Sequence, residues 1–105
     1  ISMGYNGFPR GVEDTQARLQ DRETKYRMIL HAEQNAMAFA TGSLEGATMF
    51  CTHPCCTQCA AMAIQRGIKH VCWPKPAPEF VERWSNDMAL SMEMFMEAGV
   101  KVHVG

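Results

Sequence analysis

The sequence has no long apolar run and no excess of charge of either sign. A helix that spans a bilayer needs about 20 consecutive apolar residues, and no stretch of these 105 residues approaches that. The chain carries 10 basic and 11 acidic residues, a formal net charge of −1. It therefore lacks the basic excess typical of proteins that bind nucleic acids broadly. We expect neither a membrane nor a nucleic acid as its partner.

The chain also lacks the evenly numbered, spaced cysteines of a secreted disulfide framework. There are five cysteines, and three of them fall within five residues: Cys51, Cys55, Cys56, Cys59 and Cys72. Clustered cysteines with histidines in the same chain favour a metal site in a reducing compartment. We therefore expect a cytoplasmic protein. His70 and His103 flank predicted strands, and we expect them to be structural or exposed.

Strand and helix patterns alternate along the chain. Strands are expected at residues 1–5, 47–52, 69–73 and 100–104, and helices at 31–41 and 57–66. A further helix is indicated by apolar residues three or four positions apart: Val81, Trp84, Met88, Met92 and Phe95. Gly99 should end that helix, and the polar residues 12–24 should form an exposed loop or an irregular helix. This order predicts an α/β domain with helices packed on a sheet.

Two short motifs carry the chemistry: His31-Ala32-Glu33 and Cys56-Thr57-Gln58-Cys59. One imidazole and two thiolates give three zinc ligands and leave a fourth position for water, which is typical of a catalytic site. Residues two apart point to different sides of a helix, so His31 and Glu33 can converge only near a helix start. Together the motifs match the H-x-E and P-C-x-x-C signature of zinc deaminases, in which the glutamate is the general acid and base.

The second motif leaves one ligand open, because Pro54 precedes Cys55 rather than Cys56. Either Cys55 is the first thiolate ligand, with three residues before Cys59, or Cys56 is, with two. We favour Cys56, since a two-residue gap suits chelation at a helix start. A non-catalytic alternative also stands, in which Cys55 or His53 closes the zinc site as a fourth protein ligand.

Four segments resemble the deoxycytidylate (dCMP) deaminases within the cytidine deaminase-like superfamily. They are GYNGFPRG at 4–11, TKY at 24–26, HAEQNA at 31–36 and CAAMAIQRGIKHV at 59–71. The resemblance implies a three-layer α-β-α sandwich with a central mixed sheet. It also implies a single deaminase domain over residues 1–105, without the N-terminal helix and first strand with which the family fold opens.

The resemblance further implies the reaction. The family converts dCMP and water to dUMP and ammonia, which supplies dUMP for thymidylate synthesis. One catalytic Zn²⁺ would be held by His31, Cys56 and Cys59. Zinc hydroxide would attack C4 of the base, and Glu33 would shuttle the protons.

By the same resemblance, three residues are expected to contact the nucleotide. Asn6 would contact its sugar or base, Asn35 would lie near it, and the Ala32 backbone N–H would donate to the pyrimidine carbonyl. The monophosphate requires cationic partners, and the spacing does not choose among Arg10, Lys25, Arg27 and Arg83.

Regulation and assembly are also expected from the family. Many relatives are hexamers that dCTP activates and dTTP inhibits, with Mg²⁺ accompanying the regulatory nucleotide near the loop at residues 4–11. Other deaminases of the superfamily, acting on tRNA adenosine, guanine or a riboflavin precursor, are the alternatives. The charge of −1 disfavours the tRNA enzyme.

Overall fold

The structure, a computed structural model, describes residues 2–105 except for the side chain of Tyr26. It divides into two compact units, residues 1–40 and 41–105. Among the described residues, no helix has the length and apolar character needed to cross a membrane.

The first unit contains three short helices: α1 (Gln16–Gln20), α2 (Arg22–Met28) and α3 (Ala32–Phe39). Thr15 and Asp21 cap the first two, because their side-chain oxygens accept backbone N–H groups that a helix start leaves unpaired. The polar segment 12–24 is expected to be an exposed loop or an irregular helix, and the structure shows that most of it is helical.

The strand expected at residues 1–5 is not formed by the described residues 2–5. They run against helix α3 instead. A Cβ atom added to Gly4 would clash with the backbone nitrogen of Ala36 and the backbone oxygen of Ala32. Only a residue without a side chain permits so close an approach. The alternating pattern there reflects packing on a helix, and one isolated antiparallel bridge, Gly7 to Leu30, follows it.

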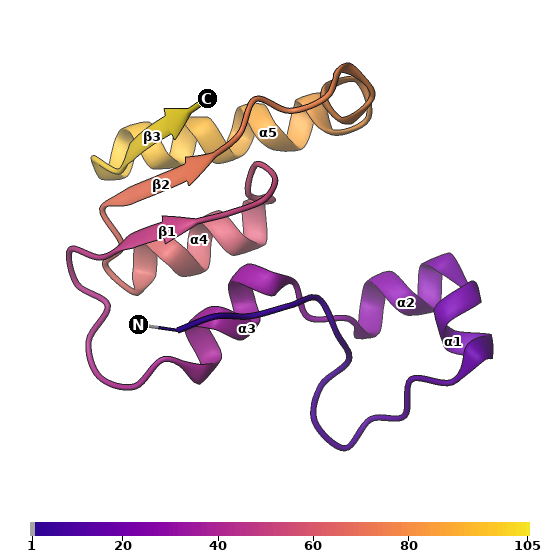
Figure 1. The fold of residues 1–105 in the computed structure, drawn as a ribbon. Coiled ribbons are helices and arrows are strands. Elements are labelled where there is room, and N and C mark those ends of the chain that lie inside the picture. Colours follow the sequence, from indigo (N-terminus) through magenta and orange to yellow (C-terminus); the bar gives the residue numbers. More distant parts are fainter. Residues whose placement is uncertain (1) are drawn as a thin grey trace. The chain divides into compact units, whose positions relative to one another are not determined.

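The second unit is a three-stranded sheet with two helices. Its elements are β1 (Thr48–Phe50), α4 (Thr57–Gln65), β2 (His70–Trp73), α5 (Pro78–Ala98) and β3 (Lys101–Val104). The strands lie in the order β1-β2-β3 (Figure 1) and both pairings are parallel. The α/β class is confirmed, and the expected mixed sheet is corrected to a parallel one over these strands. Each crossover returns the chain in the same direction, so parallel neighbours result.

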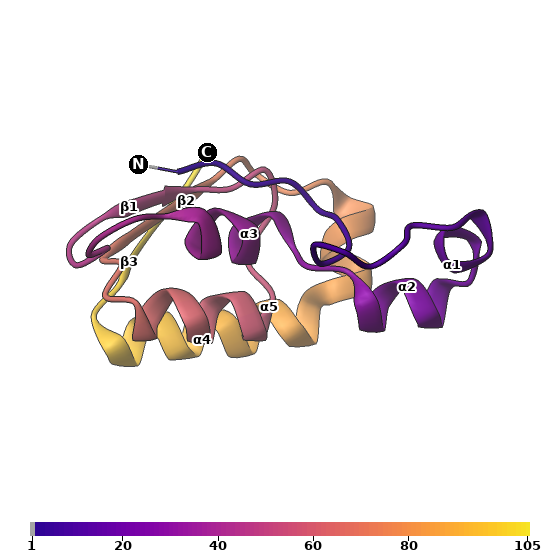
Figure 2. The same cartoon turned by 90° about the horizontal axis from the view of Figure 1, so that it is seen from below.

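Both helices of this unit cover the same face of the sheet (Figure 2). Val71 on β2 and Phe95 on α5 are fully buried between the sheet and the helices. The small buried side chains of Ala60 and Ala63 let α4 pack closely on the sheet. This unit thus supplies two layers, and the three-layer sandwich stays a prediction. The opposite face of the sheet carries side chains open to solvent, with Phe50 81% exposed.

Helix α5 has the predicted position, and Gly99 ends it in a left-handed conformation with φ 76°. Its apolar stripe is only partly buried, however. Phe95 is buried, whereas Val81 and Trp84 are exposed. At 1.5 Å per residue, the 21 residues of α5 extend well beyond the nine of α4, so the first turns of α5 have less to pack against.

Candidate functional site

Helix α3 begins at His31, which is its N-cap residue. His31 has extended backbone angles, φ −72° and ψ 155°, and its backbone N–H donates to Gln34 Oε1 at 2.9 Å. Glu33 lies in the first turn and is half-buried. The expectation that His31 and Glu33 lie near a helix start is confirmed.

The loop before the helices is tied to the start of α3 by two short hydrogen bonds. The Ala32 backbone N–H donates to Asn6 Oδ1 at 2.6 Å, and Asn35 Nδ2 donates to the Tyr5 carbonyl at 2.6 Å. The three predicted substrate-binding residues are therefore joined through this segment of the first unit. Because Asn6 already accepts the Ala32 N–H, a pyrimidine carbonyl would have to take its place. The substrate roles stay predictions.

Helix α4 begins in the same manner, at Cys56. This N-cap residue is extended, with φ −70° and ψ 168°, and its Sγ accepts the Cys59 backbone N–H at 3.4 Å. Cys59 lies in the first turn and is fully buried. The free N–H groups and positive dipole end of a helix start stabilise thiolates, which are the form that binds metal ions.

The neighbouring Cys55 has a different environment. It is buried, and its Sγ lies 3.7 Å from Cys51 Sγ. Cys56 Sγ instead faces the first turn of α4. This arrangement favours Cys56 over Cys55 as the partner of Cys59. All five cysteines carry free thiols, which agrees with the exclusion of a disulfide framework.

Two residues that hold these helix starts in place were not predicted from the sequence. Gln34 caps α3, and its position three residues after the N-cap is the capping-box spacing, so a local signal existed. Asp87 on α5 holds α4: its Oδ2 accepts the Thr57 N–H and its Oδ1 accepts the Thr57 hydroxyl, both at 3.1 Å. Thirty residues separate this pair, and nothing in the sequence connects them.

The contacts of the candidate phosphate-binding cations do not single out one of them. Arg10 lies 5.8 Å from the centre of the Phe39 ring, and Arg83 lies 6.0 Å from that of Trp84. Arg27 pairs with Glu23 at 3.4 Å, and both side chains are highly exposed. An exposed pair contributes little to stability, so these contacts do not exclude a phosphate.

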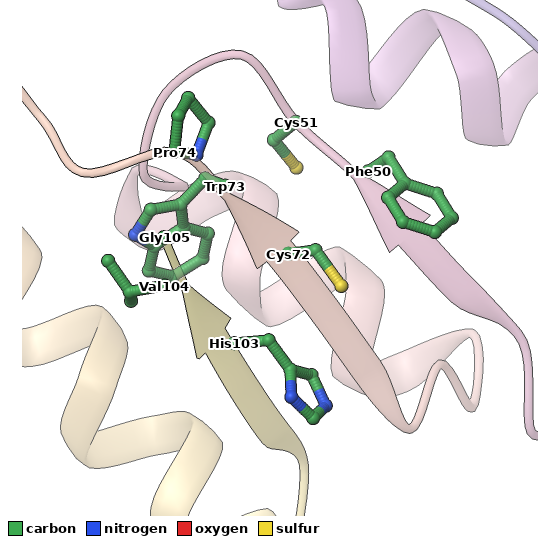
Figure 3. A pocket seen from close by; sticks show the side chains of 8 residues that line it. All are labelled: Phe50, Cys51, Cys72, Trp73, Pro74, His103, Val104 and Gly105. Carbon is green, nitrogen blue, oxygen red and sulfur yellow. The ribbon is translucent and has the colours of Figure 1, made fainter.

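A hollow of about 310 Å³ lies at the carboxyl ends of the strands in the second unit (Figure 3). It is lined by residues 50–51, 72–74 and 103–105. Ligands of parallel α/β sheets commonly bind near strand carboxyl ends. However, the lining contains none of the residues predicted to bind zinc or substrate.

Comparison with known sequences decides the family. The pattern of the cytidine and deoxycytidylate deaminase zinc-binding region matches residues 1–74. The chain belongs to this family. The matched range includes both motifs, so the predicted family and its association with zinc are confirmed.

Similar proteins from other organisms extend the comparison. The chain is 45% identical to an uncharacterized deaminase in the luxG 3′ region of Aliivibrio fischeri, over 97% of this chain and 69% of that protein. It is 35% identical to the deoxycytidylate deaminase of Pongo abelii, over 68% of this chain but only 43% of that enzyme. The chain thus spans less than half the length of this second relative.

A solved structure supports the same fold. The dCMP deaminase of cyanophage S-TIM5 in its apo form is 28% identical, with a TM-score of 0.70 over 100% of this chain and 71% of that one. The same phage enzyme in complex with dCMP and dUMP gives 27% identity and a TM-score of 0.67, over 97% and 70%. The α/β fold of a dCMP deaminase is therefore confirmed.

Proposed function

We propose that the protein is a zinc-dependent hydrolase that converts dCMP and water to dUMP and ammonia. One observation carries the proposal: each family motif occupies the start of a helix. His31 is the N-cap of α3, and Cys56 is the N-cap of α4. At both places the chain offers a metal-binding side chain at the positive end of a helix dipole, which favours anionic ligands.

In the proposed site, His31, Cys56 and Cys59 hold one Zn²⁺. Each offers one atom that zinc binds, an imidazole nitrogen from His31 and a sulfur from each cysteine. Zinc binds such ligands with bonds of about 2.0–2.1 Å to nitrogen and about 2.3 Å to sulfur. When bound, zinc would lower the pKa of a water molecule towards neutrality and so supply a nucleophile.

Glu33 is the proposed proton carrier. Its carboxylate takes one proton from the attacking water and delivers it to the ring nitrogen next to C4. It then helps to pass the second proton to the departing amino group, which leaves as ammonia. The oxygen of water becomes the new carbonyl oxygen at C4, so the atoms balance. The position of Glu33 in the first turn of α3, two residues after the proposed ligand His31, supports this role.

The choice of dCMP as substrate is supported by the relatives. The phage enzyme was solved with dCMP and dUMP, and the shorter matches include a deoxycytidylate deaminase. Asn6, Ala32 and Asn35 are the proposed nucleotide contacts. For the Ala32 N–H this requires Asn6 Oδ1 to yield its hydrogen bond to the base, which would free Asn6 to face the sugar.

A substrate panel tests the proposed function. The zinc-loaded protein is assayed for ammonia release from dCMP, CMP, deoxycytidine and guanine, with a chelator-treated sample as the control. We expect dCMP to react fastest and the chelated sample to be inactive. Fastest release from guanine would replace the substrate assignment. Inertness on all four, with zinc still bound, would refute the enzymatic function.

The regulation expected from the family is proposed for the same loop. Residues 5–7 are bonded to the start of α3 and to Leu30, so a dCTP–Mg²⁺ complex bound at residues 4–11 would act on Ala32 through the Asn6 side chain. Adding dCTP with Mg²⁺ should shift the substrate saturation curve to lower dCMP, and dTTP should oppose it. An unchanged curve at every nucleotide concentration would contradict this. Light scattering tests the proposed hexamer.

A further inference from the structure

Two histidines meet on the solvent-facing side of the sheet in the second unit. His70 begins β2 and His103 lies on β3. His70 Nδ1 and His103 Nε2 are 3.2 Å apart. The ring centroids are separated by 5.5 Å and the planes differ by 22°. Because the centroids are farther apart than the nitrogens, the rings face each other through these two atoms.

This nitrogen separation suits a shared metal ion. Two ligands that each lie about 2.0–2.1 Å from one ion are about 2.8–3.4 Å apart when the angle at the metal is between a right angle and the tetrahedral value. The observed 3.2 Å falls inside that range. In the structure the two facing nitrogens form a hydrogen bond. A metal ion would lie beside the line that joins them, because two bonds of about 2.0–2.1 Å do not fit along a separation of 3.2 Å. The hydrogen-bonding proton would leave, and both rings would turn their lone pairs toward the ion.

The surroundings permit such an ion to enter. His70 is half-buried and His103 is exposed, so both nitrogens lie near solvent. Cys72 is the parallel-register partner of His103, and Figure 3 shows the two on the same side of the sheet. Lys101 lies opposite His70 in the strand register, and its positive charge repels a metal ion. Its side chain is exposed and flexible, however, so the charged end can stay in water and away from the site.

We propose that His70 and His103 form a second metal site, which binds a divalent ion that favours imidazole, such as Ni²⁺ or Zn²⁺. The pair shares no residue with the proposed catalytic set, so this inference stands or falls independently of it. A bound ion would fasten the edge strand β3 to β2. Imidazole sites follow the usual affinity order, so Ni²⁺ should bind more tightly than Co²⁺.

Calorimetric titration tests this second site. Ni²⁺ is added to the zinc-loaded full chain, and the zinc content is measured afterwards to show that nickel has not displaced it. We expect one Ni²⁺ per chain beyond the zinc. His70→Ala and His103→Ala should each lower the Ni²⁺ affinity by at least about tenfold, since loss of even an outer partner of a metal typically costs 10–100-fold.

His53→Ala is the matched control, because His53 is also exposed but stacks on Phe80 instead. It should bind Ni²⁺ like the wild type. Thermal melting gives a second readout: Ni²⁺ should raise the midpoint of the wild type and of the control, but not of the two variants. No Ni²⁺ uptake by the wild type, or equal uptake by His70→Ala and His103→Ala, would overturn the proposal.

Discussion

Asp87 is expected to set the strength of zinc binding although it is not a proposed ligand. Its carboxylate accepts two hydrogen bonds from Thr57, the first residue of α4, which directly follows Cys56. The carboxylate therefore anchors the helix start that presents both proposed thiolate ligands. Replacing Asp87 with alanine should let this first turn fray and change the spacing of the two sulfur atoms.

The magnitude follows from the lost contacts. A hydrogen bond to a charged group contributes about 1.5–3 kcal/mol, and a carboxylate at a helix N-terminus adds about 0.3–1 kcal/mol. We therefore expect Asp87→Ala to lower the free energy of unfolding of the metal-free protein by about 2–4 kcal/mol. Residues that orient metal ligands typically affect affinity by 10–100-fold, so zinc should bind weaker by about that factor. Asp87→Asn keeps one acceptor and should lie between.

Competition with a chromogenic chelator measures the zinc affinity, and denaturant unfolding of the metal-free protein measures stability. Glu93→Gln is the matched control, because Glu93 is an exposed acidic residue on the same helix. It should change neither quantity noticeably. If Asp87→Ala binds zinc within twofold of the wild type, the carboxylate does not organise the proposed site and the reasoning is wrong.

Four further substitutions test other parts of the structure. Cys56→Ser should abolish tight zinc binding, whereas Cys55→Ser should keep it; metal analysis after dialysis compares them, and the reverse result would exchange the ligands. Gly4→Ala should destabilise the protein by about 2 kcal/mol or more, because its Cβ would clash with the backbone of α3; an unchanged melting midpoint would show that the segment is not packed there. Gln34→Ala removes a capping hydrogen bond and should cost about 0.5–2 kcal/mol, which denaturant unfolding will detect or refute.

Features that depend on a few neighbouring residues could be predicted from the sequence. The helix starts at His31 and Cys56 follow from the residue order within each motif. The end of α5 at Gly99 follows from the ease with which glycine adopts a positive φ. Helix α2 could have been predicted too, since Asp21 is a strong N-cap residue, but the charged segment around it obscured the signal.

Features that depend on distant residues could not be predicted. Residues 2–5 alternate like a strand, yet a strand forms only beside a partner, and here the segment packs on α3. The contact of Asp87 with Thr57 joins two helices across thirty residues. The pairing of His70 with His103 requires the parallel register of β2 and β3, which the sequence pattern does not fix.

The most direct test of the central claim is dCMP turnover by the zinc-loaded Glu33→Gln variant. Glutamine has nearly the same size but cannot carry a proton as a carboxylate does. General acid–base catalysis contributes about 10²–10⁴-fold, so ammonia release should fall by at least about 100-fold while the zinc content stays equal to that of the wild type. Full activity of Glu33→Gln on dCMP would contradict the proposed mechanism, and an inactive zinc-loaded wild type would contradict the proposed function.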